Sequence, residues 1–162
     1  MADYLTVAEV YRMQYRLIEL FGGIHGVRDK AAVEAAVFRP QTGYYNSIEE
    51  EATALMESLG NNHGFLDGNK RIAFTAADVF LRRNGFYIEV EGHEGQAFIV
   101  GSMERHEFRF AQILDWIRQH IKPLVQAFPF IYYLLFTVDR HNHATTLALQ
   151  PEATGKLLHK FL

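Results

Sequence analysis

The sequence contains no cysteine among its 162 residues, which excludes a disulfide framework and zinc sites built on thiolates. This absence is compatible with a reducing compartment. A strong excess of one charge is also lacking, because 16 Lys and Arg stand against 19 Asp and Glu, a formal net charge of −3. General binding of nucleic acid would require a basic face. We therefore expect no nucleic-acid partner.

Long hydrophobic runs are absent as well. The longest apolar run covers residues 128–138 and is far shorter than the ~20 residues that span a bilayer. The first ten residues, MADYLTVAEV, include an early Asp and Glu and lack the basic start and apolar core of a signal peptide. We therefore expect a cytoplasmic protein with no membrane partner.

Apolar residues make up 49% of the chain, enough for one sizeable core, and their spacing is mainly helical. Two patterns typical of capping boxes, Thr6 with Glu9 and Ser47 with Glu50, precede periodic apolar runs. The segment RPQTGYYN is predicted to be a loop and FYIEV to be extended. The predicted fold class is all-α, with helices over residues 7–21, 30–38, 48–59, 71–83, 94–105 and 110–121.

One of these helices should be central, because residues 71–83 are apolar on nearly every side. Beyond about Gln126 the composition changes to an aromatic run followed by a polar segment. We therefore predict a domain over residues 1–125 and an extension of unknown role over 126–162. Within that extension, His141 and His143 are interpreted as loop histidines and the aromatic run as a packed segment.

The stretch NNHGFLDGNKRIAF, residues 61–74, gathers polar residues directly before the predicted central helix. The start of a helix presents free N–H groups and the positive end of the helix dipole, and both attract phosphate. Gly68 would let the backbone approach an anion closely, and Lys70 and Arg71 add positive charge. These residues predict a phosphate site.

Three further residues of the stretch suggest what is done with the phosphate. Asp67 lies beside the anion site, where a carboxylate is repelled unless a cation such as Mg²⁺ bridges it to phosphate. His63 could accept a proton from an incoming hydroxyl, since histidine is the commonest general base. Phe65 is predicted to anchor the loop. The combination predicts transfer from a nucleotide phosphate to a hydroxyl.

Each residue also has a purely structural interpretation. His63 could be an ordinary loop histidine, Asp67 with Gly68 a turn, and Asn69 the cap of the following helix. Lys70 and Arg71 could be solvated charges, but cations are unfavourable in a first helical turn without an anion. The pair Arg82 and Arg83 is interpreted as structural, at a helix C-terminus.

The segment HGFLDGNKRIAF resembles the Fic motif, and it is most similar to the death-on-curing (Doc) branch of the Fic/Doc superfamily. The resemblance extends over roughly residues 4–121. It implies a Fic-like helical bundle whose motif loop precedes a central buried helix, and an enzyme that modifies a protein hydroxyl with ATP and Mg²⁺. By position it implies His63 as the general base and Asp67 as the Mg²⁺ ligand, and it assigns the phosphate site to Gly68, Asn69, Lys70 and Arg71.

Departures from the motif bear on the reaction. AMP-transferring members end the motif with Arg, where this chain has Phe74, and the Asn69-Lys70-Arg71 run with an apolar final residue resembles the Doc branch. The preferred prediction is therefore a kinase that phosphorylates a Ser or Thr hydroxyl of a translation factor, elongation factor Tu by family resemblance. AMP transfer remains an alternative, which Gly68 favours, and a catalytically silent Fic-like binding module is another.

Regulation is predicted from the absence of a motif. Many Fic proteins carry an inhibitory Ser/Thr-x-x-x-Glu-Gly/Asn helix, and the nearest stretch here, Ser47 to Ala52, does not match it. The resemblance therefore implies a toxin with a separate antitoxin protein as its partner. A masking role for residues 126–162 is a further hypothesis.

Overall fold

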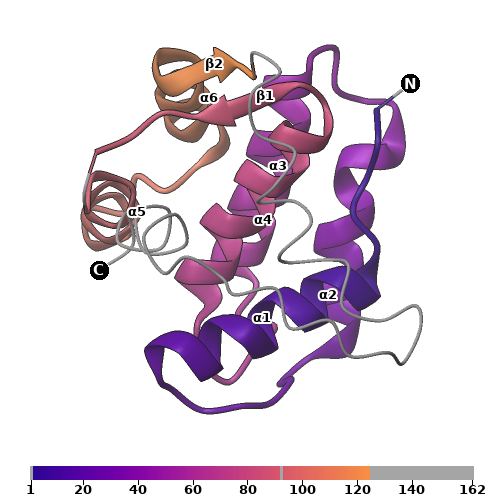
Figure 1. Cartoon of the computed structure of the whole chain (residues 1–162), viewed down its shortest axis with the longest axis vertical. Coiled ribbons are helices and arrows are strands. Elements are labelled where there is room, and N and C mark those ends of the chain that lie inside the picture. The colour runs from indigo at the N-terminus through magenta and orange to yellow at the C-terminus, as the bar shows by residue number, and fades with distance from the viewer. Residues whose placement is uncertain (1, 92, 125–162) are drawn as a thin grey trace, which may run out of the picture.

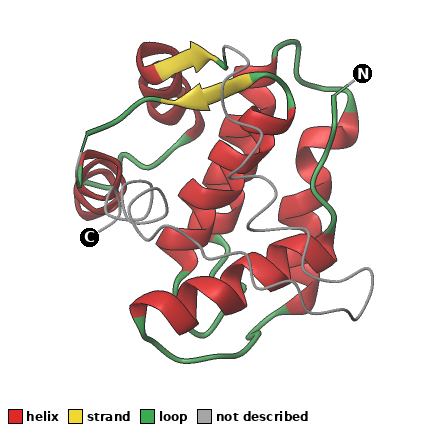
Figure 2. Cartoon of the chain, in the orientation of Figure 1, coloured by secondary structure: helices red, strands yellow, loops and turns green. Residues whose placement is uncertain are grey.

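The computed structural model describes residues 2–91 and 93–124, and this part of the chain is mainly helical (Figures 1 and 2). The all-α prediction is therefore confirmed. In chain order the elements are α1 (Val7–Phe21), α2 (Lys30–Phe38), the 3-10 helix η1 (Arg39–Thr42), α3 (Ile48–Asn61), α4 (Asn69–Arg83), β1 (Phe86–Ile88), α5 (Glu94–Glu104), α6 (Phe110–His120) and β2 (Ile121–Pro123).

Helix α4 is the centre of the fold, as its apolar composition predicted. It packs along α3 and also contacts α1, α5 and β1 (Figure 1). Its apolar side chains are all buried: Ile72, Ala73, Phe74, Ala76, Ala77, Val79, Phe80 and Leu81. Burial on all sides fixes the direction of α4 and hence the position of its first turn.

Helix α1 is bonded to both ends of α4. The capping box at its start is confirmed, with Glu9 N donating to Thr6 Oγ1 at 3.3 Å and Thr6 N donating to Glu9 Oε2 at 2.8 Å. Glu9 also pairs with Arg83, which is buried at the end of α4. At the other end, Arg71 Nη1 donates to the carbonyl of Gly22 at 2.8 Å. These bonds hold the end of α1 beside the first turn of α4.

The last turn of α4 confirms the structural interpretation of its two arginines. Arg82 Nε lies 2.6 Å from Asp78 Oδ2, and the other oxygen of Asp78 accepts a hydrogen bond from Ile88 N at 2.8 Å. The Arg83 side chain is 5% exposed and is paired with Glu9. Arg83 therefore joins the end of the central helix to α1, whereas Arg82 orients Asp78, which accepts the hydrogen bond from β1.

Two local predictions are wrong, and a third is confirmed only in part. Arg39–Thr42 forms a 3-10 helix instead of a loop, which its Pro residue permits because the first turn of a helix needs no N–H there. The box at Ser47 forms by half, since Glu50 Oε2 accepts from Asn46 N at 2.9 Å and not from Ser47 N. Ile121 belongs to β2, which pairs antiparallel with β1.

The short sheet follows from Pro123, since a residue that precedes proline avoids the helical region. Ile121 therefore leaves the helix and pairs with Ile88, and Pro123 occupies the strand end.

No helix among residues 2–91 and 93–124 is long and apolar enough to cross a membrane. The predictions for residues 126–162 lie outside the described residues.

Candidate active site

The motif loop, residues 62–68, connects α3 to α4 and is held by its middle residue. The Phe65 side chain is 1% exposed and meets the Tyr11 ring edge-on, with ring centroids 6.0 Å apart. Its backbone forms an isolated antiparallel bridge with Val27. Leu66 N donates to the carbonyl of Gly26 at 3.0 Å, which extends this pairing. The predicted anchoring role of Phe65 is thus confirmed, and the segment after α1 supports the loop.

Asn69 closes the motif loop from within α4. Its Oδ1 accepts a hydrogen bond from Phe65 N at 3.0 Å, and its Nδ2 donates to the carbonyl of Phe65 at 2.9 Å. The capping alternative for Asn69 is wrong, because Gly68 is the N-cap of α4 and no side chain of the described residues caps that end. The amide instead fixes the loop in the shape that carries His63 and Asp67.

Gly68 adopts the left-handed region, with φ 76° and ψ 12°, which favours glycine. The first hydrogen bond of the helix runs from Ile72 N to the carbonyl of Gly68, at 2.9 Å. The N–H groups of the first turn have no acceptor within the helix, and in the part of the chain that the structure describes no side chain caps them. The start of α4 therefore offers N–H donors and the positive end of its dipole to a ligand.

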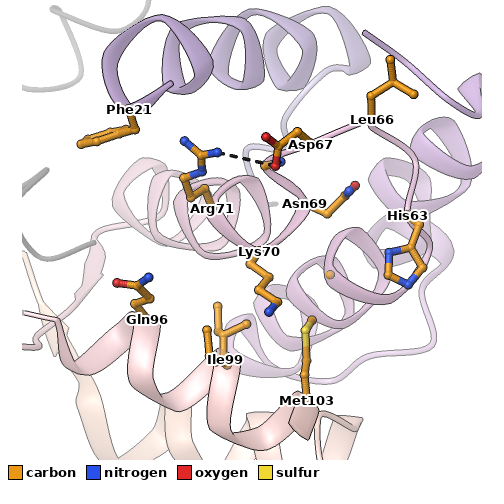
Figure 3. Close-up of a pocket in the computed structure, with 13 residues that line it drawn as sticks. Phe21, His63, Leu66, Asp67, Asn69, Lys70, Arg71, Gln96, Ile99 and Met103 are labelled. Carbon is orange, nitrogen blue, oxygen red and sulfur yellow. Dashed lines mark hydrogen bonds and ion pairs between the residues drawn. The ribbon is translucent and has the colours of Figure 1, made fainter. Parts of the chain in front are cut away.

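The two cations of this first turn differ in their contacts. Arg71 Nη1 donates to Gly22, and its Nη2 lies 3.7 Å from Asp67 Oδ1. For Lys70, by contrast, the described part of the chain supplies no ion pair or hydrogen bond to the ammonium group. Figure 3 shows Lys70 extending toward Ile99 and Met103 of α5. Lys70 is therefore the cation available to an incoming anion, whereas Arg71 also braces α4 against α1.

Asp67 is held by backbone donors and remains accessible. Its Oδ1 accepts from Gly68 N at 2.6 Å and its Oδ2 from Ile24 N at 3.3 Å, while its side chain is 42% exposed. Among the described residues no group of three or more His, Cys, Asp or Glu could hold a metal ion. A single accessible carboxylate beside the free N–H groups of a helix start nevertheless fits Mg²⁺, which is commonly held by one or two carboxylates together with substrate phosphates.

His63 has an unusual backbone, with φ 49° in the left-handed region, and an exposed side chain. Left-handed non-glycine residues cost free energy and cluster at functional sites. Figure 3 places His63 on the far side of Asn69 from Arg71, at the rim of the same hollow. The loop thus presents the imidazole at some cost in backbone strain.

These side chains line one pocket with a volume of about 510 Å³ (Figure 3). Its walls come from the end of α1, the motif loop, the first turn of α4 and one face of α5. The lining residues are Phe21, Gly60, His63, Leu66, Asp67, Gly68, Asn69, Lys70, Arg71, Gln96, Ile99, Val100 and Met103. Every residue predicted for the site from the sequence therefore lines the same cavity.

The sequence is similar to a known family and to two named proteins. The Fic/DOC family model matches residues 4–81. "Protein kinase doc" of Escherichia phage P1 is 33% identical over 90 residues, which are 52% of this chain and 71% of that protein. The chain belongs to the Fic/DOC family. "Toxin Doc" of Mycolicibacterium smegmatis is 42% identical over 76 residues, 44% of this chain and 58% of that protein.

Both relatives carry the name Doc, and the chain belongs to this death-on-curing branch of the Fic/DOC family. The matched segment spans only 58% of the length of the first relative. The activities in the names of these relatives therefore apply to this chain only as a proposal.

The final motif position, Phe74, lies in the core of this Fic/DOC protein. Phe74 is 6% exposed and meets the Trp116 ring edge-on, at 6.2 Å between centroids. It also lies against α5, since a Cβ added at Gly95 would be 2.7 Å from Phe74 Cε2. Phe74 is not among the lining residues of the pocket. It supports α5, the helix that forms one wall.

Sequence reasoning missed that wall and one buried support. Ile99 and Met103 have helical apolar spacing, which indicates only that they face the interior and does not identify a pocket. Gln14 is 4% exposed, and its Nε2 donates to the carbonyl of Asp67 at 3.2 Å. A polar residue on the apolar face of α1, one turn after Val10 and one before Ile18, was the signal that could have revealed it.

Proposed function

We propose that this protein is a Doc-type toxin that transfers the γ-phosphoryl group of ATP to a Ser or Thr hydroxyl of elongation factor Tu and so arrests translation. One observation carries the proposal. Within the described part of the chain, a single pocket combines an exposed imidazole, an uncapped helix start, a Lys70 ammonium without an ion pair, and an accessible carboxylate, Asp67. The names of the two relatives, a toxin and a protein kinase, support it.

The anion site determines how the nucleotide is held. The phosphates of the nucleotide accept hydrogen bonds from the N–H groups at the start of α4. Lys70 and Arg71 neutralise their negative charge, and Arg71 donates from its remaining N–H groups. Asp67 would hold Mg²⁺, which neutralises charge on the phosphate oxygens when it is bound. Leu66, Ile99 and Met103 give the pocket apolar surface beside these charges.

In the transfer step, His63 accepts the proton of the target hydroxyl. The hydroxyl oxygen attacks the γ-phosphorus, a new P–O bond forms, and the bond between that phosphorus and the β–γ bridging oxygen breaks. ADP leaves with the electron pair of the broken bond. Most of the rate acceleration would come from positioning and from stabilisation of phosphate charge, as is general for phosphoryl transfer.

Phosphoryl transfer is preferred over AMP transfer because of Phe74. An Arg at this position could contact a triphosphate, and such a charged contact is worth roughly 1.5–3 kcal/mol. In this protein the position is filled by an aromatic ring that packs against Trp116 in the core. AMP transfer through the same loop remains the alternative.

The direct test is transfer of label from ATP, carrying it at the α or the γ phosphate, to purified elongation factor Tu with Mg²⁺ present. The His63→Ala variant removes the base. His93→Ala is the matched control, because His93 is exposed and lines neither the site nor its rim. We expect γ label to move with wild type and His93→Ala but not with His63→Ala. Movement of α label would mean AMP transfer, and movement of neither would favour a binding module.

The toxin proposal includes a partner. The sequence lacks the inhibitory motif of many Fic proteins, so an active enzyme in the cytoplasm requires a separate antitoxin. We expect expression of the wild-type chain to stop growth unless the antitoxin is co-expressed, and expression of His63→Ala to be tolerated. Activity that rises on truncation after Gln126 would instead assign a masking role to residues 126–162.

A further inference from the structure

A second pocket of about 390 Å³ shares three lining residues, Gly60, His63 and Met103, with the candidate active site. Its other walls come from the last turn of α3 and from the connection between α5 and α6. It contains none of the phosphate-site residues, Gly68 to Arg71. His63 therefore stands between a pocket suited to a nucleotide and a second pocket with a different lining.

The two pockets have different lining residues and therefore suit different ligands. The second one is lined by Glu57, Gly60, Asn61, His63, Met103, His106, Phe108 and Arg109. Among the described residues, His63 and His106 are the two non-glycine residues with positive φ, at 49° and 58°, and both line this pocket. The left-handed backbone of His106 belongs to the cap that ends α5, where His106 N donates to the carbonyl of Met103 at 3.1 Å and Glu107 N to that of Ser102 at 2.7 Å. This cap fixes the connection between α5 and α6 that forms one wall of the second pocket.

Arg109 gives the second pocket its charge. The carboxylate of Glu57 is already engaged, since its Oε2 lies 2.8 Å from Arg39 Nη1 and its Oε1 accepts from Phe110 N at 2.7 Å. Arg109 Nε donates to the carbonyl of His106 at 3.3 Å, and within the described part of the chain no carboxylate forms an ion pair with its guanidinium. The pocket therefore offers a positive charge to its occupant.

We infer that the second pocket is the acceptor subsite: it receives the target segment that carries the reactive hydroxyl, and Arg109 selects an acidic residue next to that hydroxyl. The inference rests on the proposed function. A base that takes the proton of the acceptor must border both the nucleotide and the acceptor, and of the three residues that line both pockets His63 is the one with a titratable side chain. Arg109 is thus a specificity residue, and it does not touch the reacting atoms.

The test compares steady-state transfer of γ label to purified elongation factor Tu by three variants. Arg109→Gln removes the charge and Arg109→Glu reverses it. Arg105→Gln is the matched control, because Arg105 lies nearby, pairs with Glu107 at 2.6 Å and lines neither pocket. Arg109 and Arg105 are both exposed residues, so all three variants should fold.

For Arg109→Gln we expect the KM for the target to rise about fivefold, as for a partly exposed charged contact, with kcat and the KM for ATP unchanged. Arg109→Glu should raise the KM for the target further, whereas Arg105→Gln should behave like wild type. A KM for the target that is equal in Arg109→Gln and Arg105→Gln overturns the inference alone, as does a change confined to the KM for ATP. Failure of wild type to label elongation factor Tu would refute the proposed function and this inference with it.

Discussion

Replacing His63 with glycine should make the protein more stable while it abolishes transfer. The His63 backbone has φ 49°, a region that costs a non-glycine residue about 1–2 kcal/mol and costs glycine almost nothing. Glycine also gives the unfolded chain more conformational freedom, which lowers the free energy of unfolding by about 0.4–1 kcal/mol. The His63 side chain is exposed, so its removal should expose little buried surface. We expect a net gain of about 0.5–1 kcal/mol.

The gain would be measured by urea unfolding followed by circular dichroism, and it corresponds to a rise of roughly 1–4 °C in Tm for a chain of this size. His63→Ala is the matched control, because it also removes the imidazole but keeps the strained backbone. Both variants should lose γ-label transfer by about 10²–10⁴-fold, as for a general base. A His63→Gly variant that is less stable than His63→Ala would refute the strain argument, and retained transfer would refute the role as base.

Further expectations concern the supports of the site and the fold. Asn69→Ala removes two hydrogen bonds to the motif-loop backbone and should lower the free energy of unfolding by about 1–3 kcal/mol in urea melts, with transfer reduced. Gly23→Ala, at φ 129°, would place a Cβ 2.5 Å from Asp67 Oδ2, so the Mg²⁺ concentration for half-maximal transfer should rise. Burial alone would raise the pKa of Glu9, but hydrogen bonds from Arg83 and Thr6 lower it below its usual 4.5. Ionised Glu9 therefore stabilises the folded state above pH 4.5, and this contribution is lost as pH falls through the lowered pKa. In Glu9→Gln the free energy of unfolding should depend less on pH in the acid range.

Local signals in the sequence were sufficient for most of the helices. Thr6 caps α1 as its pattern predicted, because a helix cap depends on a few neighbouring residues. Ile121 was misassigned because its apolar spacing continues that of α6. The strand partner that captures it, Ile88, lies far away in sequence, and no local pattern reports such a pairing.

The site was predictable in composition but not in the roles of adjacent residues. Lys70 and Arg71 are consecutive cations, and successive helical side chains point about 100° apart. One therefore extends toward α5, and the other returns to the carbonyl of Gly22 (Figure 3). The role of Asn69 could not be predicted from the sequence either, because a side-chain amide can cap a helix or can bond the backbone of the preceding loop. Which one forms was decided by the position of Phe65, which is set by burial and by pairing with Val27.

The wall formed by α5 connects the motif to the hydrophobic core. Phe74 meets Trp116 edge-on, and Trp116 stacks on Phe98 of α5 with centroids 4.3 Å apart and planes within 6°. This aromatic chain holds α5 opposite Lys70, so the apolar residue that ends the motif shapes the pocket without lining it. Gly95 belongs to the same contact, because any Cβ there would meet the Phe74 ring at 2.7 Å. Changes at these core positions would therefore move a wall of the pocket, and their effect on transfer should exceed what their loss of stability alone accounts for.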